Sequence, residues 1–477
     1  MDQILRGYYL NDPTWFYLSF LLILAVFFKF SRFWSIRNLD LGLLLSVSPG
    51  LLLVRSDDAR WVAYGYAWLF IATALLLLRA LSDGLITRRP RLEQNMNAAG
   101  MAFLCAAVFL FLTTKLLRDA VPESSVQSIR SGAELIAGEQ KAPPALSDTA
   151  VAGPDQTLPD TAKPGPGTPL VAAGMAQISK AVAKQNPDGP SSAVDVEIVT
   201  ARLLAIFAHL AVILGLTLVG RHIFGDSEVG FAMATLYMLL PCTAYDVGKI
   251  NHVLPAALVV WAIWAYRRPV ITGMLLGLAS AMMFFPIFLL PLWASFYGKR
   301  GGLRFGLAVV LTATCIVSSL LLLSNDSQVL VHQFLGYVPV DELIGRALGN
   351  STGDAVVASP DFWGPREPAY IIPVFVTYLV MLVALTVWPR RKSLAQVIPH
   401  SAALVIGTQF WYPWQGGVYV LWYLPLLLLA VFRPLMTNHF APEFKPWPWF
   451  RRAATRVESR TELAAATAGR LLSADRP

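Results

Sequence analysis

Residues 204–219 read LAIFAHLAVILGLTLV, and residues 305–323 read FGLAVVLTATCIVSSLLLL. Each run is apolar over a length close to the roughly 20 residues that a helix needs to cross the hydrocarbon core of a bilayer. Neither run alternates between polar and apolar residues, as a strand of a membrane β-barrel does. Because a backbone in hydrocarbon must satisfy its own hydrogen bonds, both runs predict transmembrane helices.

The composition supports the same class for the whole chain. The 477 residues are 56% hydrophobic and 14% charged, whereas soluble domains carry about 25% charged residues. A soluble fold is therefore excluded, and the sequence predicts an all-α membrane protein: a polytopic helical bundle of about 11–13 transmembrane helices. The candidate spans are 15–30, 40–54, 61–79, 97–114, 200–219, 229–244, 253–266, 270–284, 286–298, 303–323, 371–389, 396–410 and 417–432.

The net charge of +8 is explained by membrane topology, because the Lys and Arg residues are spread over many loops. We therefore expect membrane lipids as partners and no nucleic acid. Basic loops are typical of the cytoplasmic side, so the N-terminus is expected outside and the C-terminus in the cytoplasm. The three cysteines lie in or beside apolar segments and predict neither a disulfide framework nor a metal site, and no cofactor is expected.

Four regions are expected along the chain. Residues 1–120 form an N-terminal four-helix membrane unit, and residues 121–195, rich in Pro, Gly, Ala and Ser, form a disordered external linker. Residues 196–437 form a membrane core with an external loop at 324–370. Residues 438–477 form a basic amphipathic tail on the cytoplasmic surface.

The most compact polar segment of the core is Tyr245-Asp-Val-Gly-Lys-Ile-Asn-His252, between two apolar spans. Its carboxylate (Asp246), ammonium (Lys249), amide (Asn251) and imidazole (His252) could form a cap that binds a phosphate or a sugar. The alternative is a wet loop in which Asp246 and Lys249 only pair with each other.

Other polar and aromatic groups fall on the same expected external side. Loop 324–370 carries Arg366 and an aromatic knot at Phe362-Trp363, a mixture that suits carbohydrate. The aromatic stretch 409–417 is interpreted as an interfacial belt or, less simply, as a sugar platform. Asp119 follows span 97–114, and Asp57-Asp58 is another external acidic pair. Either could be a general base for an acceptor hydroxyl, although Asp57-Asp58 has Arg55 and Arg60 as flanking counter-charges. No nucleotide-binding or hydrolase motif occurs in the chain.

The order of features in residues 201–323 resembles the GT-C superfamily of membrane glycosyltransferases, within it the polyprenyl-phosphate-mannose-dependent mannosyltransferase-like group. The likeness rests on the Gly248-Lys-Ile-Asn251 cap, a span ending in Tyr266-Arg-Arg-Pro269, the small residues Gly273, Gly277 and Ala279, and the double proline of Phe285-Pro-Ile-Phe-Leu-Leu-Pro291. Two positions differ: Lys249 stands where the group often has Gln, and Met283 where it often has Lys.

The resemblance implies a catalytic carboxylate in the first external loop of the core, a loop that usually contains ordered helices. Asp119 is the matching candidate for the base, Lys249 or Arg366 for neutralising the departing phosphate, and Asn251 and His252 for shaping the pocket. The implied function is transfer of a sugar from a polyprenyl-phosphate-linked donor to an extracytoplasmic acceptor, in a bacterial inner membrane. The alternative is a non-enzymatic membrane protein, either a transporter or an envelope-assembly scaffold.

Overall fold

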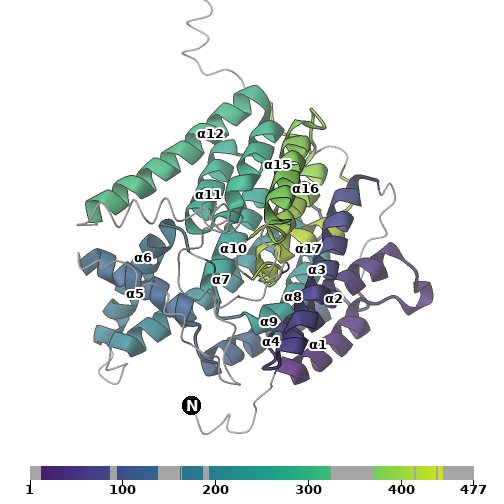
Figure 1. The fold of residues 1–477 in the computed structure, drawn as a ribbon, viewed down its shortest axis with the longest axis horizontal. Coiled ribbons are helices and arrows are strands. Elements are labelled where there is room, and N and C mark those ends of the chain that lie inside the picture. Colours follow the sequence, from purple (N-terminus) through teal and green to yellow (C-terminus); the bar gives the residue numbers. More distant parts are fainter. Residues whose placement is uncertain are drawn as a thin grey trace, which may run out of the picture.

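A computed structural model describes residues 12–85, 94–137, 162, 164–185, 193–323, 362, 370–412, 415–436 and 439–443. Their regular secondary structure is helical, apart from one isolated bridge between Ser393 and Phe440. The helices form a packed bundle (Figure 1), which confirms the all-α membrane class. Arg366 and most of the loop 324–370 and of the tail 438–477 lie outside the described residues.

Five helical segments are long and apolar enough to cross a membrane: 36–54, 59–85, 98–118, 196–222 and 285–323. They belong to α2 (Ile36–Val54), α3 (Ala59–Leu81) with η2 (Ser82–Leu85), α4 (Ala98–Arg118), α7 (Ala193–His222), and η3 (Phe285–Phe288) with α12 (Leu289–Leu323). Shorter apolar helices are α1 (Asp12–Phe27), α10 (Ile250–Trp264), α11 (Pro269–Met282), α15 (Ile371–Val387) and α16 (Leu394–Thr408). The remaining elements are η1 (Phe30–Arg32), α5 (Glu123–Ala137), α6 (Gly167–Gln185), α8 (Ser227–Leu239), α9 (Pro241–Tyr245), η5 (Val420–Trp422) and α17 (Leu424–Phe432).

Side-chain caps explain where several of these helices begin. Asn97 accepts a hydrogen bond from the Gly100 amide at 2.8 Å and starts α4. The Asp226 side chain does the same for the first turn of α8. Ser393 and Gln396 form a capping box at the start of α16. Such caps satisfy backbone N–H groups that have no partner within the helix, and so fix the ends of the spans.

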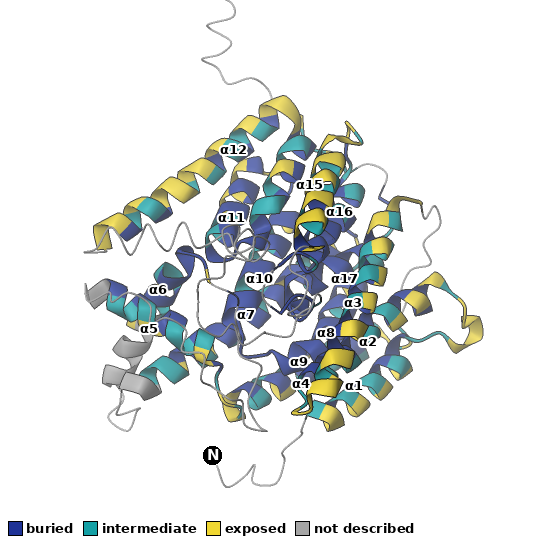
Figure 2. Ribbon diagram, viewed as in Figure 1, coloured by how far each residue is buried: buried dark blue, intermediate teal, exposed yellow. Residues whose placement is uncertain are grey.

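The core of the bundle lies around α8, α10, α16 and α17, whose residues are nearly all buried. By contrast, α12 and α15 lie at the periphery, and exposed residues cover much of their outer surface (Figure 2). Large apolar side chains on these surfaces, such as Val310, Leu322 and Val383, are more than half exposed. A belt of exposed apolar side chains around a buried core is what lipid contact requires.

The prediction of a disordered linker is wrong for two parts of 121–195. Residues of α5 spaced three to four apart are buried, among them Ser125, Ile129, Gly132 and Leu135, so one side of this helix packs. Serine and glycine share that side with isoleucine and leucine, so the overall composition of the segment concealed a helical pattern. α5 and α6 pack together at the lower left of Figure 1.

α6 is anchored to the core through its N-terminus. The Gly165 amide and the Thr168 hydroxyl both donate to the carbonyl oxygen of Met282, at 2.7 and 3.1 Å. That carbonyl belongs to the last residue of α11, where a helix leaves acceptors without partners. A small apolar cluster joins α5 and α6 to α11 and α12, and consists of Leu135, Leu170, Leu278, Ala281, Ile316 and Leu320.

Buried charges link α2 and α3 to the end of α17. Arg79 on α3 forms a bidentate pair with Asp40 on α2 and bonds Asp83 at 3.0 Å. Arg433, just after α17, bonds the other oxygen of Asp83 at 2.5 Å. Buried charges require partners of opposite sign. These ion pairs therefore hold α2 and α3 against the segment that follows α17.

We predict that Gly132→Val destabilises the protein by about 1–3 kcal/mol, because a Cβ at this position would lie 2.6 Å from the carbonyl oxygen of Pro169 on α6. Gly174→Val on α6 is the matched control, since a Cβ there meets nothing within 4 Å. Thermal unfolding in detergent measures both. Equal melting temperatures for the two variants would contradict the packing of α5 on α6.

Candidate functional site

The polar segment 245–252 is a buried turn between α9 and α10. Pro241 begins the short helix α9, and Lys249 is the residue that precedes the first turn of α10. The Lys249 ammonium lies 3.2 Å from the Asp246 carboxylate, and the two side chains are only 5% and 9% exposed. The pairing expected from the sequence is therefore present, but the loop is not wet. Burying both charges requires further partners.

Arg55, at the C-terminal end of α2, supplies one of those partners. Its guanidinium bonds Asp246 at 2.8 Å and the Tyr245 carbonyl at 3.1 Å, and it lies 4.8 Å from the centre of the Tyr245 ring. A second nitrogen bonds Asp12 at 2.9 Å. Arg55, named from the sequence as a flanking counter-charge of Asp57-Asp58, is thus bonded to Asp12 and Asp246, while Asp58 caps α3 by accepting from the Arg60 amide at 2.9 Å.

The network continues from Asp12 to the predicted base. The Lys115 ammonium lies 3.4 Å from Asp12 and 2.6 Å from Asp119. Charges of opposite sign thus alternate without interruption in the order Asp119, Lys115, Asp12, Arg55, Asp246, Lys249. We call these six residues the charge chain. It brings Asp119 and Lys249 into one network, with three carboxylates matched by three cations.

Asp119 and Asp246 differ in environment. Burial favours the neutral form of Asp246, but the charges of Lys249 and Arg55 outweigh this, and the pKa of Asp246 is lowered. Asp246 therefore remains a carboxylate and serves as a counter-ion. The side chain of Asp119 is 32% exposed and ends the charge chain, so it can meet a substrate.

α5 is docked against the polar turn by two serines. The Ser125 hydroxyl donates to the Gly248 carbonyl at 2.9 Å, and the Ile250 amide donates to Ser125 at 3.3 Å. The side chains of Ser128 and Asn251 bond each other at 3.1 Å. Asn251 thus contacts the loop helix, and the helix closes over the turn that carries Asp246 and Lys249.

Close packing keeps Asp119 beside the same turn. A Cβ on Gly248 would lie 2.6 Å from the ring of Pro122, three residues after Asp119, so only glycine allows this approach. Arg202 on α7 also donates to the Asp119 carbonyl at 3.2 Å. The position of the carboxylate is therefore set from three elements: α4, α7 and the 245–252 turn.

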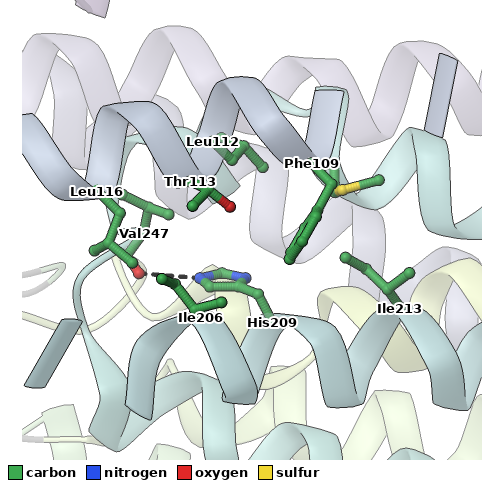
Figure 3. A pocket seen from close by; sticks show the side chains of 9 residues that line it. Phe109, Leu112, Thr113, Leu116, Ile206, His209, Ile213 and Val247 are labelled. Carbon is green, nitrogen blue, oxygen red and sulfur yellow. Dashed lines mark hydrogen bonds between the residues drawn. The ribbon is translucent and has the colours of Figure 1, made fainter. Parts of the chain in front are cut away.

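His209 on α7 contacts the backbone of the 245–252 turn. Figure 3 shows its ring in a small apolar pocket between α4 and α7, pointing to the Val247 carbonyl at 3.0 Å. The Tyr237 hydroxyl lies 3.0 Å from the other ring nitrogen. A carbonyl only accepts, so His209 donates to Val247 and accepts from Tyr237. The pocket has room for about one water molecule and is too small for a sugar.

His252 and the aromatic stretch 409–417 form a different environment. His252 is buried and accepts a hydrogen bond from the Trp422 indole at 2.6 Å. Trp411 and Tyr412 are also buried and pack against Phe284. These two residues are core packing, so neither an interfacial belt nor an exposed sugar platform describes them. Phe362 of the predicted knot packs against Phe70 and Phe410.

Sequence reasoning missed Asp12, Arg55, Lys115 and His209. His209 had a detectable signal, because an ionisable residue inside an apolar span is costly and usually has a purpose. Among the described residues, no group of three or more His, Cys, Asp or Glu is placed to hold a metal ion.

Residues 190–413 match the model of Glycosyltransferase family 87, one of the GT-C-type membrane glycosyltransferases. No curated protein and no solved structure matches the chain. The match confirms the resemblance to the GT-C superfamily and supports a membrane glycosyltransferase. It includes Asp246, Lys249, Asn251 and His252, and it excludes Asp12, Arg55, Lys115 and Asp119.

We predict that Arg55→Met destabilises the protein by roughly 3 kcal/mol, because it leaves the buried Asp246 with one cation in place of two. Arg60→Met is the control, since Arg60 is exposed at the start of α3 in the same loop. Thermal unfolding in detergent compares them. A loss no larger than that of Arg60→Met would show that the Arg55–Asp246 pair contributes nothing.

The lowered pKa of Asp246 predicts a loss of stability in acid. A carboxyl group whose pKa is lower in the folded state stabilises the fold above its unfolded pKa, about 4, and this contribution disappears as the pH falls through the folded value. The melting temperature of wild type should therefore exceed that of Asp246→Asn at neutral pH, and the difference should shrink below pH of about 4. A difference that is constant with pH would contradict the assignment.

Proposed function

We propose that the protein transfers a sugar from a polyprenyl-phosphate-linked donor to an acceptor on the extracytoplasmic side of a bacterial inner membrane. The observation that carries this proposal is the charge chain, which connects a partly exposed carboxylate, Asp119, to a buried ammonium, Lys249. Acceptor activation and phosphate departure need these two types of group.

The reaction follows from the two ends of the charge chain. The acceptor hydroxyl attacks the anomeric carbon of the donor, and its proton passes to the Asp119 carboxylate. The bond from that carbon to the phosphate oxygen breaks, and the polyprenyl phosphate leaves with the electron pair. Lys115 bonds Oδ2 of Asp119. A carboxylate has a second oxygen, which can accept from the hydroxyl. Lys249 is assigned to the developing phosphate charge.

The proposed orientation rests on where charges lie along the helices. α7 ends at Arg221 and His222, and α10 ends shortly before Arg267 and Arg268. The 245–252 turn lies at the opposite, N-terminal end of α10, and Asp119 follows the C-terminal end of α4 beside that turn. Basic loops favour the cytoplasm, so the charge chain is assigned to the opposite side. The charge chain would thus lie near one surface of the membrane. This position also favours a transferase over a transporter, whose site usually lies near the middle of the bilayer.

Two features of the first external loop support the same proposal. α5 follows Asp119 directly and α6 comes later in the same segment, and α5 contacts the polar turn through Ser125 and Ser128. The GT-C resemblance implies such helices beside the catalytic carboxylate. In this chain they would form one wall of the space in which donor and acceptor meet.

We predict that Asp119→Asn lowers sugar transfer by about a hundredfold or more, because the amide cannot accept the proton. Purified protein in detergent or nanodiscs would be assayed with polyprenyl-phosphate-linked sugars and membrane-extracted acceptors. Asp57→Asn is the matched control, since Asp57 is an exposed carboxylate in the nearby 55–60 loop. Undiminished transfer by Asp119→Asn would overturn the assignment of the base. Absence of transfer by wild type with every donor would favour a non-enzymatic membrane protein.

A further inference from the structure

The loop between α1 and α2, residues 29–34, exposes large aromatic side chains at the edge of the bundle. Phe30, Phe33 and Trp34 are 73%, 61% and 95% exposed. Figure 2 shows the loop protruding beside α1 and α2, with residues 30–34 exposed. We call residues 29–34 the aromatic loop. An exposed apolar patch of this kind marks a surface that another molecule covers.

A buried side chain holds the backbone of the aromatic loop in this conformation. The side-chain oxygen of Asn38, on α2, accepts from the Lys29 amide at 3.1 Å. Its side-chain nitrogen donates to the carbonyl oxygens of Lys29, Arg32 and Phe33, each at 3.1 Å. The outward direction of the aromatic rings is therefore built into the fold. A partner that binds them does not have to order the loop first.

The end of α1 that leads into the aromatic loop is fastened as well. Arg37 donates twice to the Phe27 carbonyl, at 2.7 and 3.2 Å. Asn95, just before α4, bonds three further carbonyl groups at this end, those of Ala25, Val26 and Phe28. The last carbonyls of a helix have no partner within the helix, and here α2 and the start of α4 supply partners for them. The loop thus has a fixed position on the bundle.

The aromatic loop lies at the end of α1 and α2 that is opposite to the charge chain. α1 begins at Asp12 and α2 ends just before Arg55, and both of these residues belong to the charge chain. The exposed sides of α1 and α2 that lead to the loop are apolar, and they include Tyr17, Leu18, Leu21, Ile36 and Leu39. Such helix surfaces face hydrocarbon, so the loop lies at the level where hydrocarbon meets the lipid headgroups.

The aromatic loop is also basic. It contains Lys29 and Arg32, and the sequence has no Asp or Glu between Asp12 and Asp40. Asp40 is buried and paired with Arg79. Within the part of the chain that the structure describes, neither Lys29 nor Arg32 forms an ion pair. Cations without a carboxylate, placed beside exposed aromatic rings, match the surface of a leaflet that contains anionic lipids.

We propose that the aromatic loop is a preformed docking surface for anionic phospholipids. Lys29 and Arg32 bind the negatively charged headgroups. Phe30, Phe33 and Trp34 enter the boundary between the headgroups and the acyl chains. A protein partner fits this surface less well, because protein interfaces are depleted in lysine. It would also have to displace lipid from the adjoining sides of α1 and α2. The loop thereby sets the depth of the first two helices and gathers anionic lipid around them.

The test uses the full chain in vesicles, with a fluorophore on Ser31→Cys. Ser31 is exposed, and its replacement leaves the cations and the rings of the loop in place. Cys315 is exposed and is changed to Ser, whereas Cys105 and Cys242 are buried. Protein that carries only Cys315→Ser should take up no label. None of these measurements involves sugar transfer, so the result does not depend on the proposed function.

All vesicles contain phosphatidylcholine and phosphatidylglycerol in one fixed ratio. Bromine, which quenches the fluorophore on contact, is placed near the headgroup end of the acyl chains of one lipid or of the other. We expect brominated phosphatidylglycerol to quench the Ser31 label at least about twofold more per mole than brominated phosphatidylcholine. Lys29→Gln combined with Arg32→Gln should make the two lipids equally effective. Equal quenching with both cations present, or a preference that survives their removal, would refute the binding of anionic headgroups.

Leu21→Cys provides the matched label position. Leu21 is exposed on the lipid-facing side of α1, well before Lys29 in the helix. We expect the two brominated lipids to quench a label at this position equally. The same preference for phosphatidylglycerol at Leu21 and at Ser31 would indicate a general effect of the basic protein and would count against a site in the aromatic loop.

Trp34→Ser tests the role of the rings. Because Trp34 is almost fully exposed, its loss should leave the fold intact. We expect quenching of the Ser31 label by both lipids to fall, since the loop then lies farther from the acyl chains, while the preference for phosphatidylglycerol remains. Trp61→Ser is the control, because Trp61 is an exposed tryptophan at the start of α3, at the other end of the bundle. Unchanged quenching in Trp34→Ser, or no quenching by either lipid in the original loop, would rule out insertion of the rings.

Discussion

Asp246 is the constraint on which the site depends, because it is a carboxylate that is almost fully removed from water. Such a group remains charged only where cations lie close to it, and Arg55 and Lys249 meet that condition. Arg55 in turn needs Asp12, and Asp12 contacts Lys115. Each of these charges therefore restricts the position of the next. The N-terminal segments that carry Asp12, Arg55 and Lys115 are thereby held in place relative to the turn between α9 and α10.

The loop helices complete the arrangement from the other side. α5 contacts the turn through hydroxyl groups, and α6 reaches the carbonyl end of α11 at Met282. Hydrogen bonds to unpaired backbone carbonyls are directional, so they orient the two helices more tightly than apolar contact alone would. α5 and α6 thus have defined positions against the core, and the polar turn is surrounded by α2, α4, α5 and α7.

The sequence predicted the parts of this structure that depend on local pattern. Apolar runs identified the spans, and a dense group of polar residues identified the 245–252 turn. The partners of Asp246 and His252 could not be predicted, because Arg55 and Trp422 are about 190 and 170 positions away and meet them only through packing. The helices α5 and α6 were missed for another reason: the expectation rested on the Pro-, Gly-, Ala- and Ser-rich composition of the whole segment 121–195, whereas the buried residues of α5, such as Ser125, Ile129 and Leu135, recur at helical spacing within it.

The division of the charge chain between two parts of the sequence has a consequence for how the protein is made. A chain is synthesised from its N-terminus, and its domains tend to form in that order. Asp12, Arg55 and Lys115 therefore enter the membrane before Asp246 and Lys249 exist. The helices outside the family match would act during biosynthesis as a receptor for the core, since they present a cation that the incoming carboxylate can bind as it leaves water.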